Sequence, residues 1–182
     1  MTGRTPRDFT VLLPPGWVRL PLDGSETAQA TAIAAAKAGE VPPRQRAEVR
    51  QQTMRMLRSV LTDARAAGGI DVLLCLAQRD GIPLAASCLV SYLEDERQRV
   101  PLDRLSAELA GQGGHVSAAE IARGPAVRHR HLAENMTRLD YFLPVPGRPG
   151  LLTLSFATPV APLADPLVML FDAITESLRW RS

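Results

Sequence analysis

The sequence has few of the residues that usually identify a function. Aromatic side chains make up 4% of its 182 residues, cysteine occurs twice, and Lys37 is its only lysine. The low aromatic content and a formal charge of only +2 argue against nucleic-acid binding. Two cysteines are too few for a disulfide scaffold. No apolar run approaches the roughly 20 residues that a transmembrane helix needs.

The N-terminal region contains only a short apolar run. Val11, Leu12 and Leu13 are followed directly by Pro14 and Pro15, whereas the core of a secretory signal has about 7–15 apolar residues. We therefore expect a cytoplasmic protein whose cysteines, Cys75 and Cys88, are thiols in apolar strands. The near-exclusive use of arginine among the basic residues, together with abundant alanine, is typical of a GC-rich genome and favours an actinobacterial source.

Signatures of catalysis are also missing from the sequence. It has no G-x-S-x-G motif, and neither cysteine has a flanking histidine or basic residue that would lower its pKa. The glycine-rich segment at residues 111–114 lacks the Lys-Ser/Thr of a phosphate-binding loop and reads as a turn. We expect a protein that is not an enzyme and that binds no cofactor.

His129 and His131 are the best candidates for metal ligands. They lie two residues apart in an expected strand, so both would point to the same face of a sheet. A third ligand is needed, but His115 is the only other histidine and no carboxylate has a suggestive spacing. Because arginines alternate with the two histidines, we expect a solvated strip of the sheet surface and no metal site.

The length and the hydrophobic pattern predict one α+β domain over residues 1–182. The expected helices are 25–37, 44–67, a short helix that begins at Pro101, and 165–180, with Asp165 as N-cap of the last. The expected strands are 9–13, 17–20, 72–77, 82–93, 116–122, 126–135, 138–145 and 151–158, with a hairpin turn at Asp80-Gly81. Strands that are grouped in hairpins favour a single antiparallel sheet with helices packed on one face and a C-terminal helix.

This order of elements resembles the Mog1/PsbP-like fold. Pro14-Pro15-Gly16-Trp17 is similar to the Pro-rich turn of the early β-hairpin in that family. Residues 151–158 match its last strand, and residues 165–180 match its closing helix. The family includes a nuclear-import factor, a photosystem subunit and chaperones of secreted effectors, so the resemblance implies protein binding without catalysis. It assigns no individual site residue.

The helix expected at 44–67 carries the strongest charged patch. Its six arginines against Glu48 and Asp63 give a local charge of +4. Its apolar residues fall on one arc, which consists of Val49, Met56, Leu57, Val60, Leu61 and Ala64. Four arginines share the opposite side, namely Arg44, Arg55, Arg58 and Arg65. We predict a protein-binding site that uses Arg55, Arg58 and Arg65, together with Trp180 near the chain end. The alternatives are a solvated arginine face and a tryptophan that closes the last helix onto the sheet.

The sequence favours a non-enzymatic protein-binding module, of the kind that serves a secretion system as a cytosolic adaptor or chaperone. Its expected partner is a protein of unknown identity, and self-association is compatible with the pattern. The alternative is a small-ligand carrier or sensor. That reading predicts an enclosed apolar pocket of about 300–1,000 Å³ between the sheet and the helix at 44–67.

Overall fold

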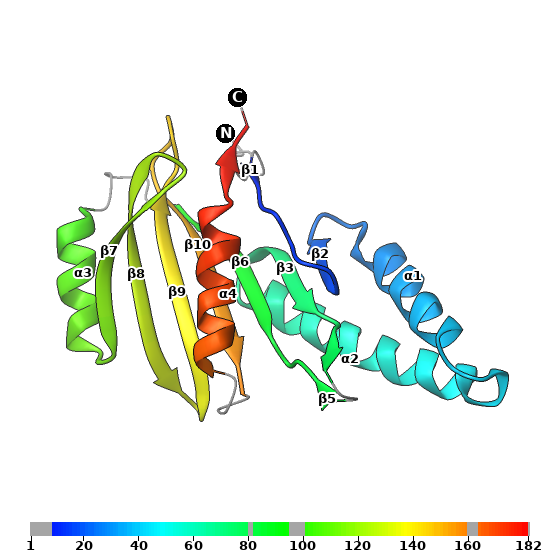
Figure 1. Ribbon diagram of the computed structural model, residues 1–182. Helices are drawn as coiled ribbons and strands as arrows, with labels where there is room; N and C mark the ends of the chain where they lie inside the picture. Colours follow the sequence, from blue (N-terminus) through cyan, green and yellow to red (C-terminus); the bar gives the residue numbers. More distant parts are fainter. Residues whose placement is uncertain (1–8, 80–81, 95–100, 160–163, 182) are drawn as a thin grey trace.

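A seven-stranded antiparallel sheet forms the centre of the protein (Figure 1). The structure is a computed structural model that describes residues 9–79, 82–94, 101–159 and 164–181. The strands follow the order β2-β3-β6-β10-β9-β8-β7, and every neighbouring pair is antiparallel. Their bounds are β2 Trp17–Pro21, β3 Gly69–Cys75, β6 Ser87–Leu93, β7 His115–Ile121, β8 Gly124–Ala133, β9 Met136–Pro144 and β10 Leu151–Thr158. The predicted α+β class and single antiparallel sheet are confirmed.

In the described residues, four α-helices accompany the sheet, at the places that the sequence pattern predicts. They are α1 Glu26–Gly39, α2 Arg46–Ala66, α3 Leu102–Gly111 and α4 Ala164–Glu176, and a short 3-10 helix, η1 Pro43–Gln45, precedes α2. Two short ladders complete the described part: β1 Phe9–Thr10 pairs with β11 Arg179–Trp180, and β4 Gln78–Arg79 pairs with β5 Ile82–Pro83. The predicted Asp80-Gly81 turn lies outside the described residues. Within the described residues, no helix has the length and apolar character to cross a membrane.

Helix α4 covers one face of the sheet, which we call the front face. Its Phe171 ring stacks on Phe156 of β10, with ring centroids 4.7 Å apart and 17° between the ring planes. Alternate residues of β9 and β10, such as Leu139 and Leu154, are fully buried in the same core. Burial of this continuous apolar surface holds the closing helix on the sheet.

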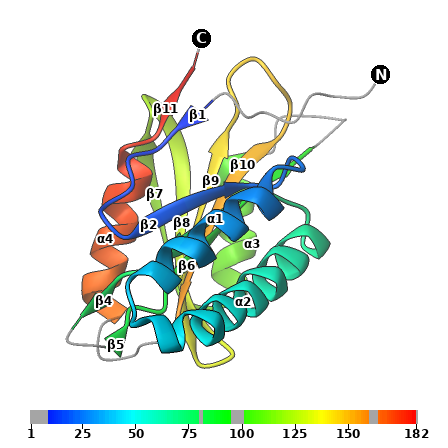
Figure 2. The ribbon, with the colours of Figure 1, turned by 90° about the vertical axis from the view of Figure 1, so that its right-hand side faces the viewer.

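The other helices lie on the opposite face, which we call the back face (Figure 2). Leu57 and Leu61 of α2 pack with Val72 and Leu74 of β3 in a second core, and α1 packs on α2. Helix α3 contacts β7 and β8. The expectation that the helices share one face is therefore wrong. The physical reason is that β3 is apolar on both of its sides. Leu73 points into the front core, whereas Val72 and Leu74 point to the back face and must be covered by a helix there.

The two ends of the chain also differ from expectation. The predicted early hairpin does not form, because β1 pairs with β11 and β2 pairs with β3. Helix α4 ends at Glu176, before Trp180, and Asp165 lies in its first turn. At the end of the helix, the Ser177 hydroxyl donates to the carbonyl of Ile174 at 2.6 Å and accepts from the Leu12 amide at 2.8 Å. This contact turns the chain away from the helical path and toward its pairing with β1.

The two tight turns of the β7-β8-β9 meander set the register of the histidine strand. Ala122 and Arg123 form the first turn, and Glu134 and Asn135 form the second, all with positive φ. The expected strands left residues 123–125 and 136–137 between them, so the observed turns begin one or two residues earlier in the chain than those gaps. The observed second turn puts His129 directly opposite residue 140 on β9.

Candidate functional site

The outward side of α2 carries Arg55 and Arg58, two of the residues predicted to bind a protein partner. Arg55 and Arg58 are exposed, and neither has a carboxylate partner among the described residues. Met56, between them in sequence, is 47% exposed. Helices α1 and α2 lie side by side, and their connection projects beyond the edge of the sheet (Figure 1). This hairpin therefore presents unpaired positive charge and an apolar side chain to solvent.

Arg65 has a different environment from the other two arginines. It forms an ion pair with Glu26, the first residue of α1, whose side chain is only 2% exposed. A second oxygen of Glu26 accepts a hydrogen bond from the amide of Gly24 at 2.7 Å. Arg65 therefore neutralises a buried carboxylate and joins the two helices, which occupies its charge within the chain.

Trp180 lies on the opposite side of the molecule from the arginines. It belongs to β11, pairs with Phe9 of β1, and packs partly buried against the front core. An adjoining surface hollow of about 500 Å³ is also lined by Glu120, Arg123 and Glu176. The four predicted residues thus do not form one surface: Arg55 and Arg58 remain together, while Arg65 is paired and Trp180 is remote.

A groove lies between α2 and the back face of the sheet, where the carrier interpretation expects a pocket. Its volume is about 480 Å³, within the range of small-ligand sites. Val60 and Leu89 give it apolar walls, but Asp63 and Arg138 bring charge to its lining. Asp63 is exposed, as is Ala67 at the end of the groove. The groove is accordingly open and mixed in polarity, unlike the enclosed apolar pocket that was expected.

A cluster of titratable side chains lies on the back face at β8 and β9. His129 and His131 point to the same face, as the sequence predicts, and Asp140 is the direct cross-strand partner of His129. One potential ligand atom from each of the three residues lies within 4.8 Å of the others. His129 is 2% exposed and Asp140 is 9% exposed. The expected solvated strip is therefore wrong for His129, which α3 and its following turn cover.

The hydrogen bonding of the cluster is incomplete. The Nε2 atom of His129 lies 2.7 Å from the carbonyl oxygen of Gly113, in the turn after α3. The Nδ1 atom of His131 lies 3.5 Å from Asp140 Oδ2 and is buried without a hydrogen-bond partner. The two imidazole rings stack, with centroids 4.4 Å apart and 16° between their planes. Burial lowers the pKa of His131, and the nearby His129 and Arg138 add to this effect against the opposing influence of Asp140.

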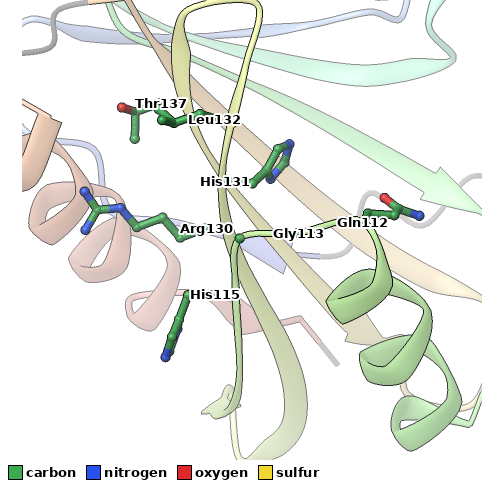
Figure 3. Close-up of a pocket in the computed structure, with 8 residues that line it drawn as sticks. Gln112, Gly113, His115, Arg130, His131, Leu132 and Thr137 are labelled. Atoms are coloured by element: carbon green, nitrogen blue, oxygen red, sulfur yellow. The ribbon is translucent and has the colours of Figure 1, made fainter.

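The turn between α3 and β7 fits closely against the two histidines. Gly114 has a φ of +89°, and a Cβ atom there would lie 2.4 Å from the carbonyl oxygen of Arg130 and 2.7 Å from the Cβ of His131. Only glycine allows this approach. Figure 3 shows His131 on the α3 side of its strand, while Arg130 and His115 project to the other side. His131 also lines a surface hollow of about 680 Å³ and is the member of the cluster that this hollow reaches.

Sequence reasoning missed Asp140 because this residue joins the histidines only through the hairpin register. In a two-residue turn at positions 134 and 135, residue 129 must face residue 140. Asn135 favours positive φ, but Glu134 does not, so the turn lacked the usual Asn-Gly signal. If each possible two-residue turn between the two strands is considered, the turn at residues 134 and 135 places the carboxylate of Asp140 opposite His129.

The front face carries a polar network that holds α4. Arg128 donates two hydrogen bonds to Asp172 of α4, at 2.8 and 3.1 Å, and the Tyr141 hydroxyl donates to the same carboxylate. Burial is the main cause of a raised pKa of Tyr141, and the bond to Asp172 adds to it. The carboxylate of Asp172 and its two donors, Arg128 and Tyr141, are thus hydrogen-bonded to one another, so we assign the network a structural role.

Both cysteines are free thiols, as predicted. Burial raises the pKa of Cys75 and, more strongly, that of Cys88, where the neighbouring Asp140 adds to the effect. A thiol with a raised pKa is a poor nucleophile near neutral pH. The cysteines therefore behave as small apolar side chains of β3 and β6.

Comparison with known proteins gives a similarity of fold. The sequence matches no protein-family model and no curated protein. Among solved structures, the chain is similar to LpqN of Mycobacterium tuberculosis, described as involved in cell envelope biogenesis, with a TM-score of 0.48 and 11% identity. The match covers 96% of this chain and 83% of that chain. A similarity this distant carries no functional argument, and the Mog1/PsbP-like family stays a prediction.

Proposed function

We propose that the protein is a non-enzymatic binding module that docks an acidic protein surface on the outward side of α2. The observation that supports this most is the pair of exposed arginines, Arg55 and Arg58, which have no carboxylate partner in the described chain. Arginine is enriched at protein interfaces. The finer proposal is an adaptor or chaperone of a secretion system with an acidic client.

The positive charge of the hairpin extends beyond these two residues. Arg44, Arg46 and Arg50 are exposed near the projecting end. The acidic residues there are already engaged, since Glu40 pairs with Lys37 and Glu48 accepts a hydrogen bond from Gln52. Guanidinium groups favour bidentate recognition of carboxylates. An acidic partner would therefore find several donors along one helix, and its association would weaken as salt increases.

Affinity purification with charge-reversal variants tests the proposal. The tagged protein and its Arg55→Glu/Arg58→Glu variant are purified from nuclease-treated lysate of the native host, and the stoichiometric partner is identified by mass spectrometry. The matched control, Arg104→Glu/Arg123→Glu, changes the net charge equally at exposed positions on α3 and the β7-β8 turn. We expect the α2 variant to weaken binding of the purified partner at least about tenfold, and the control to leave it unchanged.

The result that would overturn the proposal is equally specific. A partner that binds the α2 variant as tightly as the original protein cannot dock on this helix. Equal weakening by both variants would indicate attraction to net charge alone, without a defined surface.

The second candidate function is a small-ligand carrier, favoured by the volume and position of the groove beside α2. Its mixed lining suits a ligand with both apolar and polar groups. Native mass spectrometry of the purified protein tests this directly. A bound small molecule that is lost when Ala67→Trp fills the open end of the groove would favour the carrier.

A further inference from the structure

We propose that His129, His131 and Asp140 form a binding site for a zinc ion on the back face of the sheet. The arrangement combines two histidines at positions i and i+2 of β8 with a carboxylate at the directly opposite position of β9. Residues of this spacing share one face of a sheet. Two imidazoles and a carboxylate are a donor set that Zn²⁺ commonly takes, with water in the fourth position. This inference is independent of the proposed partner surface on α2.

The backbone around His129 prepares its ring for metal binding. A carbonyl oxygen can only accept a hydrogen bond, so the contact with Gly113 places the ring hydrogen on Nε2. The lone pair of Nδ1 is then free for a cation. Metal-binding histidines usually donate their second nitrogen in this way, which fixes both the tautomer and the orientation of the ring.

An unsatisfied polar atom gives a second, independent reason. His131 Nδ1 is buried without a hydrogen bond, and its distance of 3.5 Å from Asp140 Oδ2 is too long for a good one. Asp140 itself is 9% exposed. Buried polar atoms in native proteins normally have a partner, and an ion held by Asp140 and His131 would give the His131 nitrogen one.

The geometry requires only a local adjustment. The ligand atoms lie within 4.8 Å of one another, whereas two nitrogens on a tetrahedral zinc, each at about 2.0–2.1 Å from the metal, are roughly 3.3 Å apart. Rotation of the partly exposed His131 ring out of its stack on His129 closes this difference. The surface hollow that His131 lines gives a cation an entry path.

The charges around the site set its strength. Asp140 supplies one negative charge, and Arg138, which faces His131 across the ladder, supplies a positive charge that opposes a cation. Arg128 and Arg130 pair with α4 on the other face of the sheet. We therefore expect a moderate affinity that depends on all three ligands.

Zinc titration of the full, untagged chain tests the site. Isothermal titration calorimetry should show one equivalent of Zn²⁺ per chain. Zinc at about a hundredfold excess over the Kd should raise the Tm by roughly 5–10 °C. The variants His131→Ala and Asp140→Asn should each weaken binding at least about tenfold. The control His115→Ala removes an exposed histidine that lies on the other side of its strand and should bind as the original protein does.

Three results would overturn the inference. The first is that no zinc binds at about 100 µM, a concentration that should saturate a three-ligand site. The second is that His131→Ala and Asp140→Asn both bind zinc as tightly as the original protein. The third is that His115→Ala alone abolishes binding. If Asp140→Asn does not fold, His131→Ala and His115→Ala still decide the question. His131 is partly exposed, so its truncation leaves the core intact.

Discussion

The ion pair between Arg65 and Glu26 allows a sharp test of how α1 is held on α2. Glu26 is 2% exposed, whereas the side chain of Arg65 is 54% exposed. Removing one member of a fully buried pair costs about 3–5 kcal/mol, and an exposed pair contributes about 0–1 kcal/mol. Because only one partner of this pair is buried, we expect Arg65→Ala to lower the free energy of unfolding by about 2 kcal/mol.

Two further variants separate the charge effect from loss of packing. Glu26→Gln removes the buried charge and keeps the shape, so it should cost only about 1 kcal/mol. In the Arg65→Ala/Glu26→Gln double variant no carboxylate remains uncompensated, and its cost should be less than the sum of the two single costs. Arg58→Ala is the matched control on the same helix, since Arg58 is exposed and unpaired, and should change stability by less than about 0.5 kcal/mol.

Urea unfolding followed by circular dichroism at the helix band measures all four variants under one set of conditions. If Arg65→Ala and Arg58→Ala unfold at the same urea concentration, the pair contributes nothing and the reasoning fails. Additive costs in the double variant would likewise show that the two side chains act independently. The outcome also decides whether Arg65 could serve a partner, because a residue that stabilises the fold cannot be released without cost.

Two other predictions concern the front-face network and the turn beside the histidines. The raised pKa of Tyr141 means that its neutral form is favoured in the folded state. The contribution of Tyr141 to the free energy of unfolding should be fully present below pH ~10, the usual pKa of the phenol. Above that pH it should fall by about 1.4 kcal/mol per pH unit, because the phenol ionises in the unfolded chain and stays neutral in the folded one. Tyr141→Phe should lose less stability than the original protein between about pH 9 and 11, and equal losses in urea titrations at both pH values would contradict the assignment. Gly114→Ala should lower the unfolding free energy by about 2 kcal/mol or more because of its φ and its contact with Arg130. The control Gly111→Ala, at the open end of α3, should be neutral or stabilise by about 0.5 kcal/mol, and similar thermal unfolding of the two variants would refute the strain argument.

Local patterns in the sequence were sufficient for most of the secondary structure. The bounds of the strand at Leu151–Thr158 are confirmed at both ends, because alternating apolar and polar residues with flanking glycine and proline define it locally. The helical spacing of Leu57, Leu61 and Ala64 likewise identified the buried side of α2. Met56, assigned to the same apolar arc, is exposed because it lies at the margin of that arc.

Long-range pairing was beyond the reach of local patterns. The partner of β1 is β11, at the far end of the chain, and no local feature of either segment specifies this. The ion pair of Arg65 with Glu26 depends in the same way on how two helices cross. The sequence could identify Arg65 as basic and outward-facing, but the tertiary fold decides whether its charge is free.

The polar clusters on the two faces of the sheet differ in how completely their side chains are hydrogen-bonded. On the front face, the network under α4 is hydrogen-bonded, since Arg128 and Tyr141 both bond to Asp172. A buried nitrogen of Arg19 lacks a hydrogen bond on this face, but its side chain forms an ion pair with Asp71. The back face between α2 and α3 instead holds the buried carboxylate of Asp140 beside an unpartnered nitrogen of His131. An unsatisfied buried polar group costs about 1–3 kcal/mol, and apolar side chains at these positions would avoid that cost. Packing alone therefore gives no reason for this cluster, and a ligand that completes its bonding would supply one.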